Sequence, residues 1–232
     1  ELDGLVDWSA IGAIFTKGLS LEPRTGHPSP RIDETASGML NAIGLENVGM
    51  ARFSSEKMPF LREYKKSAQG NVLVNLFGTS IDEYAELARR LDTLDGVDGV
   101  EVNLSCPNVK EGGIAFGRDV QGCSAVTRAV RNATSKFIAV KLSPSGNVVD
   151  IAKAAEDAGA EAICMGNTVP AMAIDIETRR PKLAAVVGGL SGPAIKPIMI
   201  RWIYELKKSI RVPLIGIGGI STANDVLEYM LA

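Results

Sequence analysis

The sequence predicts an α/β protein of the (β/α)8 (TIM) barrel class, with about six of the eight strands present. Short apolar runs alternate with stretches of helical periodicity along the 232 residues, an order typical of parallel sheets flanked by helices. Polar residues collect at the carboxyl ends of these runs, where barrel enzymes place their chemistry. The alternative is an open, doubly wound sheet, which is disfavoured because no G-x-G-x-x-G motif follows the first run.

Six strands are expected, and several are almost wholly apolar, as strands covered on both faces are. They are Ile11–Thr16, Val72–Phe77, Val100–Cys106, Phe137–Leu142, Ala162–Asn167 and Pro213–Ile217. Because a barrel has eight strands, we expect the first and last to be absent. The chain begins at Glu1 rather than at Met and stops at Ala232 within an expected helix. The expectation is therefore a single barrel domain over residues 1–232, truncated at both ends.

Helices are expected between the strands. One begins at Ser80, has Glu83 at capping-box spacing, and keeps a helical apolar period to Leu94. Another begins with Asn147 as its N-cap and ends before Gly159. The expected helical ranges are 80–94, 118–131, 147–158, 194–210 and 222–231.

The composition excludes several classes of protein. A hydrophobic fraction of 46% and a charged fraction of 22% are ordinary for a globular chain. A net charge of −2 argues against nucleic-acid binding. The longest uncharged stretch, Ser67–Ile81, is shorter than the roughly 20 apolar residues of a membrane helix. With three cysteines in no CxxC pair and one histidine, His27, the sequence predicts no metal site, no disulfide framework and a cytoplasmic location.

The segment Leu19–Glu56 is rich in Pro and Gly and is expected to be a long excursion after the first strand. Long loops in compact domains are often functional. The excursion contains Asn41, Ala42, Ile43, Gly44 and Leu45. A carboxamide both donates and accepts hydrogen bonds, so Asn41 suits a neutral heterocyclic amide, although an ordinary turn is the alternative. A second, shorter insertion surrounds Arg179–Pro181.

Two lysines, Lys17 and Lys141, lie at the ends of expected strands. At the mouth of a barrel such a lysine is a fixed cation for an anionic ligand or a Schiff-base nucleophile. The alternative for either one is a surface lysine. Two at equivalent positions favour a function.

The densest polar cluster is Asn103–Asn108, with Cys106 where a proline breaks the strand. A thiol at the base of a loop acts as nucleophile or general base if its pKa is near the working pH. The alternative is a buried structural cysteine. The polar neighbours of Cys106 favour function, whereas Cys123 and Cys164 are expected to be structural.

Two glycine-rich stretches, Gly188–Gly192 and Gly216–Gly219, each precede an expected helix. Turns of this kind present backbone N–H groups to a phosphate, and barrels often bind phosphate after strands seven and eight. His27 has no second histidine to pair with and is expected to be a loop residue.

Several of these stretches resemble the dihydroorotate dehydrogenase family, in particular the catalytic subunit of its NAD-linked, two-subunit class (1B). They occur in the family's order and span almost the whole chain: Thr16-Lys17, Glu22–Arg24, Asn41–Leu45, Asn103–Val109, Gly112–Gly117, Val140–Leu142, Asn167-Thr168, Gly188–Pro197 and Gly218-Gly219. A cysteine at position 106, rather than a serine, separates the chain from the quinone-linked, membrane-associated class. Val169–Ala171 departs from the family pattern.

The resemblance implies FMN-dependent oxidation of dihydroorotate to orotate in pyrimidine (UMP) biosynthesis. Cys106 would be the catalytic base that takes the C5 proton while hydride leaves C6 for the flavin. Electrons would pass to NAD through a partner subunit that carries FAD and a [2Fe–2S] cluster. The resemblance also implies a homodimer within a heterotetramer, with neither nucleic acid nor membrane as partner.

The resemblance also assigns binding residues. Substrate would be held by Lys17, Asn41, Ala42, Ile43, Gly44, Leu45, Asn103, Asn108, Asn167 and Thr168. FMN would be held by Lys17, Gly18, Asn75, Asn103, Lys141, Gly166, Gly192, Gly218 and Gly219. Two alternatives stay open: a related FMN barrel acting on another dihydropyrimidine, and a Schiff-base or phosphate-binding barrel lyase that uses Lys141 without flavin.

Overall fold

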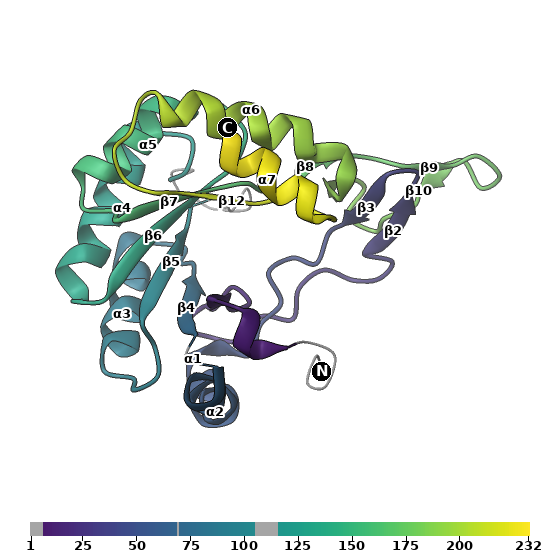
Figure 1. Cartoon of the computed structure of the whole chain (residues 1–232). Coiled ribbons are helices and arrows are strands. Elements are labelled where there is room, and N and C mark those ends of the chain that lie inside the picture. The colour runs from purple at the N-terminus through teal and green to yellow at the C-terminus, as the bar shows by residue number, and fades with distance from the viewer. Residues whose placement is uncertain (1–6, 69, 105–115) are drawn as a thin grey trace.

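The computed structural model describes residues 7–68, 70–104 and 116–232. Its frame is a sheet of six parallel strands in the order β1-β4-β5-β6-β7-β12. The strands are β1 (Ala13–Phe15), β4 (Asn71–Leu76), β5 (Gly99–Asn103), β6 (Phe137–Leu142), β7 (Ala162–Met165) and β12 (Leu214–Gly216). The sheet curls, with helices on its outer face (Figure 1). This is the incomplete (β/α)8 barrel that the sequence predicts.

The helices that cover the sheet follow one another in chain order. They are α3 (Ile81–Asp92), α4 (Val120–Ala133), α5 (Val148–Asp157), α6 (Lys196–Lys207) and α7 (Ala223–Leu231). Each packs against the next. Their N-termini are capped as expected, because the side chains of Ser80 and Asn147 accept backbone N–H bonds from Glu83 and Asp150. The five predicted helices are confirmed within a few residues at each end.

The two faces of the sheet carry different side chains. Residues such as Val100, Val102, Ile138 and Val140 point outward and form the large core shared with the helices. Alternate residues point inward, because neighbouring side chains in a strand lie on opposite faces. The inner layer is a small cluster built on Leu73, Ala139, Ala162 and Cys164. Above it, toward the carboxyl ends of the strands, the inward positions become polar.

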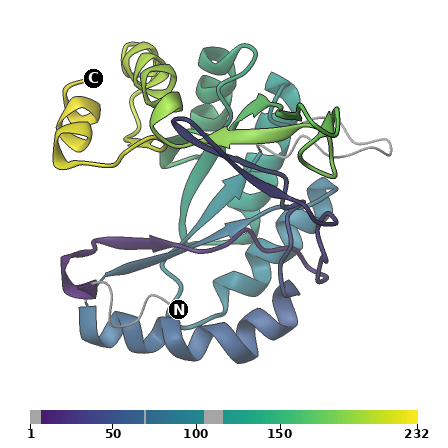
Figure 2. The same cartoon turned by 90° about the vertical axis from the view of Figure 1, so that its right-hand side faces the viewer.

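The excursion after β1 is more structured than the sequence predicts. It contains β2 (Ile32–Thr35) and β3 (Gly38–Asn41), then a short helix α1 (Gly49–Arg52) and a π-helical stretch, η2 (Phe53–Lys57). A single 3-10 turn, η1 (Trp8–Ala10), precedes β1. The hairpin of β2 and β3 belongs to a four-stranded antiparallel sheet with the order β2-β3-β11-β8, visible beside the barrel in Figure 2.

The other two strands of this sheet correct a prediction. The glycine-rich stretch after position 187 is expected to be a turn, but it forms β11 (Gly188–Ser191), between β3 and β8 (Val169–Ala171). Its residues pair with both neighbours, so Gly188–Ser191 is a strand rather than a turn, and Gly192 follows the end of that strand. The unusual Val169–Ala171 is an edge strand, which tolerates Pro170. The insertion around Arg179 is a small hairpin of β9 (Ile174–Asp175) and β10 (Arg180–Pro181).

Like α1, a longer helix has no counterpart in the sequence prediction. Helix α2 (Met58–Ala68) fills the interval before β4 and buries Met58, Leu61 and Tyr64 at helical spacing. A further short turn, η3 (Pro193–Ile195), leads into α6. None of the described helices is long and apolar enough to cross a membrane.

Candidate active site

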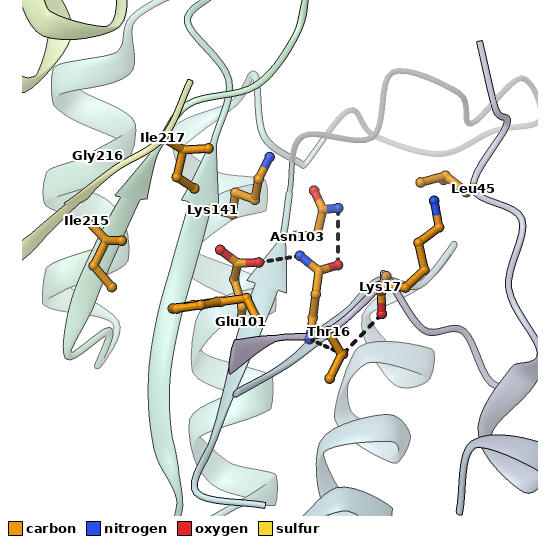
Figure 3. Close-up of a pocket in the computed structure, with 12 residues that line it drawn as sticks. Thr16, Lys17, Leu45, Glu101, Asn103, Lys141, Ile215, Gly216 and Ile217 are labelled. Atoms are coloured by element: carbon orange, nitrogen blue, oxygen red, sulfur yellow. Dashed lines mark hydrogen bonds between the residues drawn. The ribbon is translucent and has the colours of Figure 1, made fainter. Parts of the chain in front are cut away.

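A pocket opens at the carboxyl ends of the parallel strands. Its volume is about 530 Å³. It is lined by Phe15, Thr16, Lys17, Gly18, Leu45, Asn75, Glu101, Asn103, Lys141, Ile215, Gly216 and Ile217 (Figure 3). The lining therefore comes from β1, β4, β5, β6 and β12, together with one residue of the excursion. This is the position that the strand-end polar residues predict.

Six of the residues predicted to bind substrate or cofactor line this pocket. They are Lys17, Gly18, Leu45, Asn75, Asn103 and Lys141. The structure thus brings together side chains that lie more than 120 positions apart in the chain. The sequence signal was the same for four of them, Lys17, Asn75, Asn103 and Lys141, which lie at the ends of expected strands, whereas Gly18 and Leu45 came from the family resemblance.

A chain of hydrogen bonds joins three side chains across the floor of the pocket. Asn103 Nδ2 donates to Asn75 Oδ1 at 3.4 Å, and Asn75 Nδ2 in turn donates to Glu101 Oε2. The backbone N–H of Asn75 donates to Thr16 Oγ1 at 3.3 Å. These bonds fix the orientation of the Asn75 and Asn103 carboxamides relative to each other. Each amide therefore presents its remaining hydrogen-bonding groups in a defined direction.

Lys141 enters the pocket from β6, opposite Asn103 on β5 and Cys164 on β7. Burial lowers the pKa of its ammonium group below the ordinary value, because a charge removed from water is destabilised. The charge of Glu101 acts in the opposite direction and favours the protonated form. Figure 3 shows both side chains pointing into the pocket.

Glu101 lines the pocket but is not among the site residues predicted from the sequence. This side chain is only 3% exposed, and it lies two residues before Asn103 on the same face of β5. A signal was present, because a glutamate in the middle of a buried strand is costly unless it meets polar partners. The alternation Val100-Glu101-Val102-Asn103 places both polar residues toward the inside.

Leu45 brings the excursion to the pocket, and its backbone is in the left-handed region. Its φ is 59°, directly after Gly44 with a φ of 76°. Two consecutive residues with positive φ reverse the chain in a tight turn, which brings Leu45 to the pocket. His27 supports the turn, since its backbone N–H donates to Ile43 O at 3.0 Å and its ring lies 3.1 Å from Ala42 O. The prediction that His27 is a loop residue is confirmed.

The remaining predicted binding residues in the described ranges lie outside the pocket lining. Asn41 ends β3, and its Nδ2 donates to Gly189 O at 3.3 Å. Asn167 follows β7, and its Nδ2 donates to Ser143 Oγ at 2.9 Å. Its Oδ1 accepts the backbone N–H of Thr168 at 2.8 Å.

Four glycines predicted to hold the cofactor all have a positive φ. They are Gly166, Gly192, Gly218 and Gly219. At Gly166 the requirement is strict, because a Cβ there would lie 2.1 Å from the carbonyl oxygen of Ile217. The segments that follow β7 and β12 therefore approach each other closely at the mouth of the barrel. Gly218 is held in place by Tyr229, whose hydroxyl donates to its carbonyl at 2.6 Å.

The predicted base Cys106 and the predicted substrate ligand Asn108 lie outside the described residues. The other two cysteines are fully buried, one on α4 and one on β7, as expected of structural residues. Burial raises the pKa of Cys123 to about 12 and also raises that of Cys164.

We expect Cys123 and Cys164 to resist alkylation in the folded protein. At pH 8 a thiol with a pKa of about 12 has a thiolate fraction near 10⁻⁴, against roughly a quarter for an ordinary cysteine with a pKa of about 8.5. Iodoacetamide labelling at pH 8, read by mass spectrometry of peptides, should therefore modify Cys123 at least about 10³-fold more slowly than a free thiol. The unfolded protein serves as the control, where all cysteines should react alike. Rapid native labelling of Cys123 would contradict the burial.

The pocket combines two ammonium groups, two carboxamides and one buried carboxylate. Such a set suits a planar, partly anionic ligand whose edge carries amide N–H and C=O groups, since the lysines balance charge and the carboxamides match the edge. Within the described residues, no three His, Cys, Asp or Glu side chains are placed to hold a metal ion.

Comparisons with known proteins agree with this geometry. The family model for dihydroorotate dehydrogenase matches residues 1–232. The chain is 54% identical over 233 residues to a protein of Geobacter sp. (strain M21) and 55% identical over 234 residues to one of Trichlorobacter lovleyi. Both are named dihydroorotate dehydrogenase B (NAD(+)), catalytic subunit. The matches cover all of this chain and 75% of each relative.

A solved structure, DHODH of Eimeria tenella in complex with ferulenol, superposes with a TM-score of 0.78 at 20% sequence identity. It covers 95% of this chain and 67% of that one. At this identity the likeness supports the barrel fold alone. The family follows from the match over the whole sequence and from relatives that share more than half of its residues: this chain belongs to the dihydroorotate dehydrogenase family.

Proposed function

We propose that this chain catalyses the oxidation of dihydroorotate to orotate in pyrimidine biosynthesis, as the catalytic subunit of an NAD-linked dihydroorotate dehydrogenase. The observation that carries the proposal is the pocket itself. Its two lysines and two asparagines stand at the carboxyl ends of barrel strands in a chain whose relatives bear that name. An anionic ring with amide edges is the kind of substrate this lining suits.

The residues at the pocket fit FMN as the cofactor. Glu101 Oε1 is buried without a hydrogen-bond partner among the described residues, which indicates that a polar ligand completes the site. The lining includes Gly18, where a Cβ would lie 2.9 Å from Asn75 Oδ1, so the backbone there presents no side chain to a flat ring. When bound, FMN supplies the acceptor for the hydride of the substrate.

Within that site the chain's own residues would divide the work. Lys141 would lie at the N1/C2=O edge of the flavin, where its positive charge favours the reduced form. Asn75 and Asn103 would hold amide groups of the flavin and the substrate. The phosphate would lie among Gly192, Gly218 and Gly219.

The substrate would bind above the flavin, between β1 and the excursion. Lys17 would balance its carboxylate, and Leu45, brought to the pocket by the turn at Gly44, would contact the same ligand. The rest of Asn41–Leu45, together with Asn103, Asn108, Asn167 and Thr168, would complete the contacts. Cys106 would take the C5 proton as hydride leaves C6.

We further propose that a separate subunit passes the electrons to NAD. The name catalytic subunit, borne by the relatives, supports the existence of such a partner. The partner would carry FAD and a [2Fe–2S] cluster, and two copies of this chain would form a dimer within a heterotetramer in the cytoplasm.

The test is the visible spectrum of the purified protein, followed by substrate assays. We expect bound flavin that bleaches with dihydroorotate and not with dihydrouracil. Bleaching by dihydrouracil alone would favour the other dihydropyrimidine reaction. A protein without flavin, with Lys141 trapped by borohydride in the presence of a carbonyl substrate, would instead support a Schiff-base lyase.

A further inference from the structure

Glu101 is the one carboxylate among the described residues that line the pocket, and it lies deep in the barrel. Its side chain is 3% exposed. One oxygen, Oε2, accepts a hydrogen bond from Asn75, whereas Oε1 has no partner with hydrogen-bond geometry among the described residues, although the thiol of Cys164 lies close to the carboxylate. A buried carboxylate without compensation is strongly destabilising, so its presence calls for a role that an apolar residue would not fill.

The neighbouring strand supplies an opposite charge. Asn103 of β5 stands opposite Lys141 of β6, so Glu101 lies one inward position below that pair. Both side chains point to the same interior, and their charges interact. A buried ammonium group that loses a nearby opposite charge is less well compensated, which is the costly case.

Among the described residues that line the pocket or pair with Lys141 in the sheet, Glu101 is the one that carries a negative charge. From β7 Lys141 meets Cys164, whose thiol stays protonated because burial raises its pKa. From β4 and β5 the polar neighbours are the neutral carboxamides of Asn75 and Asn103, and Lys17 at the end of β1 is itself a cation. Strand β12 and the residue after it line the pocket with Ile215, Gly216 and Ile217.

We infer that Glu101 is a positioning residue of the flavin site, holding Lys141 as a charged ammonium group directed at the flavin. The presence of a flavin in this inference rests on the proposed function, whereas the pairing of Glu101 with Lys141 does not. Asn75 is also a positioning residue, because its hydrogen bond orients the carboxylate of Glu101.

The pairing is tested first on the full chain without FMN. Competitive acetylation with acetic anhydride at pH 8, read on the peptide that contains Lys141, reports the fraction of neutral amine. In the wild type we expect Lys141 to react as a largely protonated lysine. In Glu101→Gln, which keeps an acceptor for Asn75 but loses the charge, the neutral fraction should rise at least about tenfold, the lower end of the effect of a nearby opposite charge.

Two variants separate charge from structure. Glu101→Asp keeps the charge and should stay close to the wild type. Asp98→Asn removes a carboxylate at the other end of the same strand, where it pairs with Lys65, and should leave Lys141 unchanged. A largely neutral Lys141 in the wild type would overturn the inference even if Glu101→Gln did not fold. So would equal labelling of Lys141 in the wild type and Glu101→Gln.

The second measurement is made with flavin bound. The midpoint potential should fall by about 30 mV per pH unit in the wild type, the two-electron equivalent of one proton. In Glu101→Gln the midpoint potential should fall about twice as steeply with pH, at pH values above the lowered pKa of Lys141. The reason is that Lys141 is then neutral and takes up a second proton when the flavin is reduced. Identical slopes would show that the pair does not act on the flavin. If Glu101→Gln changed the acetylation of Lys141 but the wild type bound no FMN, the proposed function would be refuted and the pairing of Glu101 with Lys141 would stand.

Discussion

A Cys106→Ser variant is expected to reduce its flavin with dihydroorotate about 10²–10⁴-fold more slowly than the wild type, the usual range for a lost general base. A thiol with an ordinary pKa of about 8.5 is within reach of neutral pH, whereas a serine hydroxyl is a far weaker base. The flavin site that we propose at Lys141 and Gly218-Gly219 should stay intact, so flavin content and orotate binding should be near normal.

Stopped-flow bleaching of the flavin across a pH series provides the measurement. The residual rate of the variant should continue to rise above the pH at which the wild type reaches its plateau. Cys123→Ala is the matched control, since it removes a thiol that is buried on α4. If Cys106→Ser bleached within a few-fold of the wild type, another group would have to be the base.

In Lys141→Ala the flavin should become harder to reduce. The two-electron reduced form carries more negative charge than the oxidised form, and the variant lacks the cation that we propose beside it. A fall of about 30 mV in the midpoint potential corresponds to about 1.4 kcal/mol, and we expect a shift of at least that size. Reduction by dihydroorotate should slow accordingly.

A redox titration against a reference dye measures the shift. Lys153→Ala, on the exposed face of α5, removes a lysine far from the pocket and should leave the potential unchanged. An equal or higher potential in Lys141→Ala, with the flavin still bound, would contradict the placement of this lysine beside the ring.

The parallel frame was predictable because its signals are local. Each strand is a short apolar run, and caps such as Ser80 and Asn147 mark helix starts within the sequence itself. The barrel topology then brings all strand ends to one side, so Lys17, Asn75, Asn103 and Lys141 could be grouped before any contact was known.

The excursion was not predictable in the same way. Strands β2, β3, β8 and β11 are three or four residues long, and β3 pairs with β11 across about 150 positions of sequence. Nothing local shows that Gly188–Ser191 finds a partner in Gly38–Asn41, so glycine content alone suggested a turn. Glu101 was missed for the opposite reason: its strand was recognised, but the face on which each residue lies was not followed through.

The inner layer of the barrel has a consequence for the ligand. Ala139, Ala162 and Cys164 are small side chains that cluster with Leu73, and the strand register places Ala139 beside Glu101, which in turn lies beside Asn75. Because interiors are close-packed, one larger residue in this layer would push Glu101 and Asn75 toward the mouth. We therefore expect the small size of these side chains to set how deep a flat molecule can bind, and hence where it meets Lys17 and Leu45.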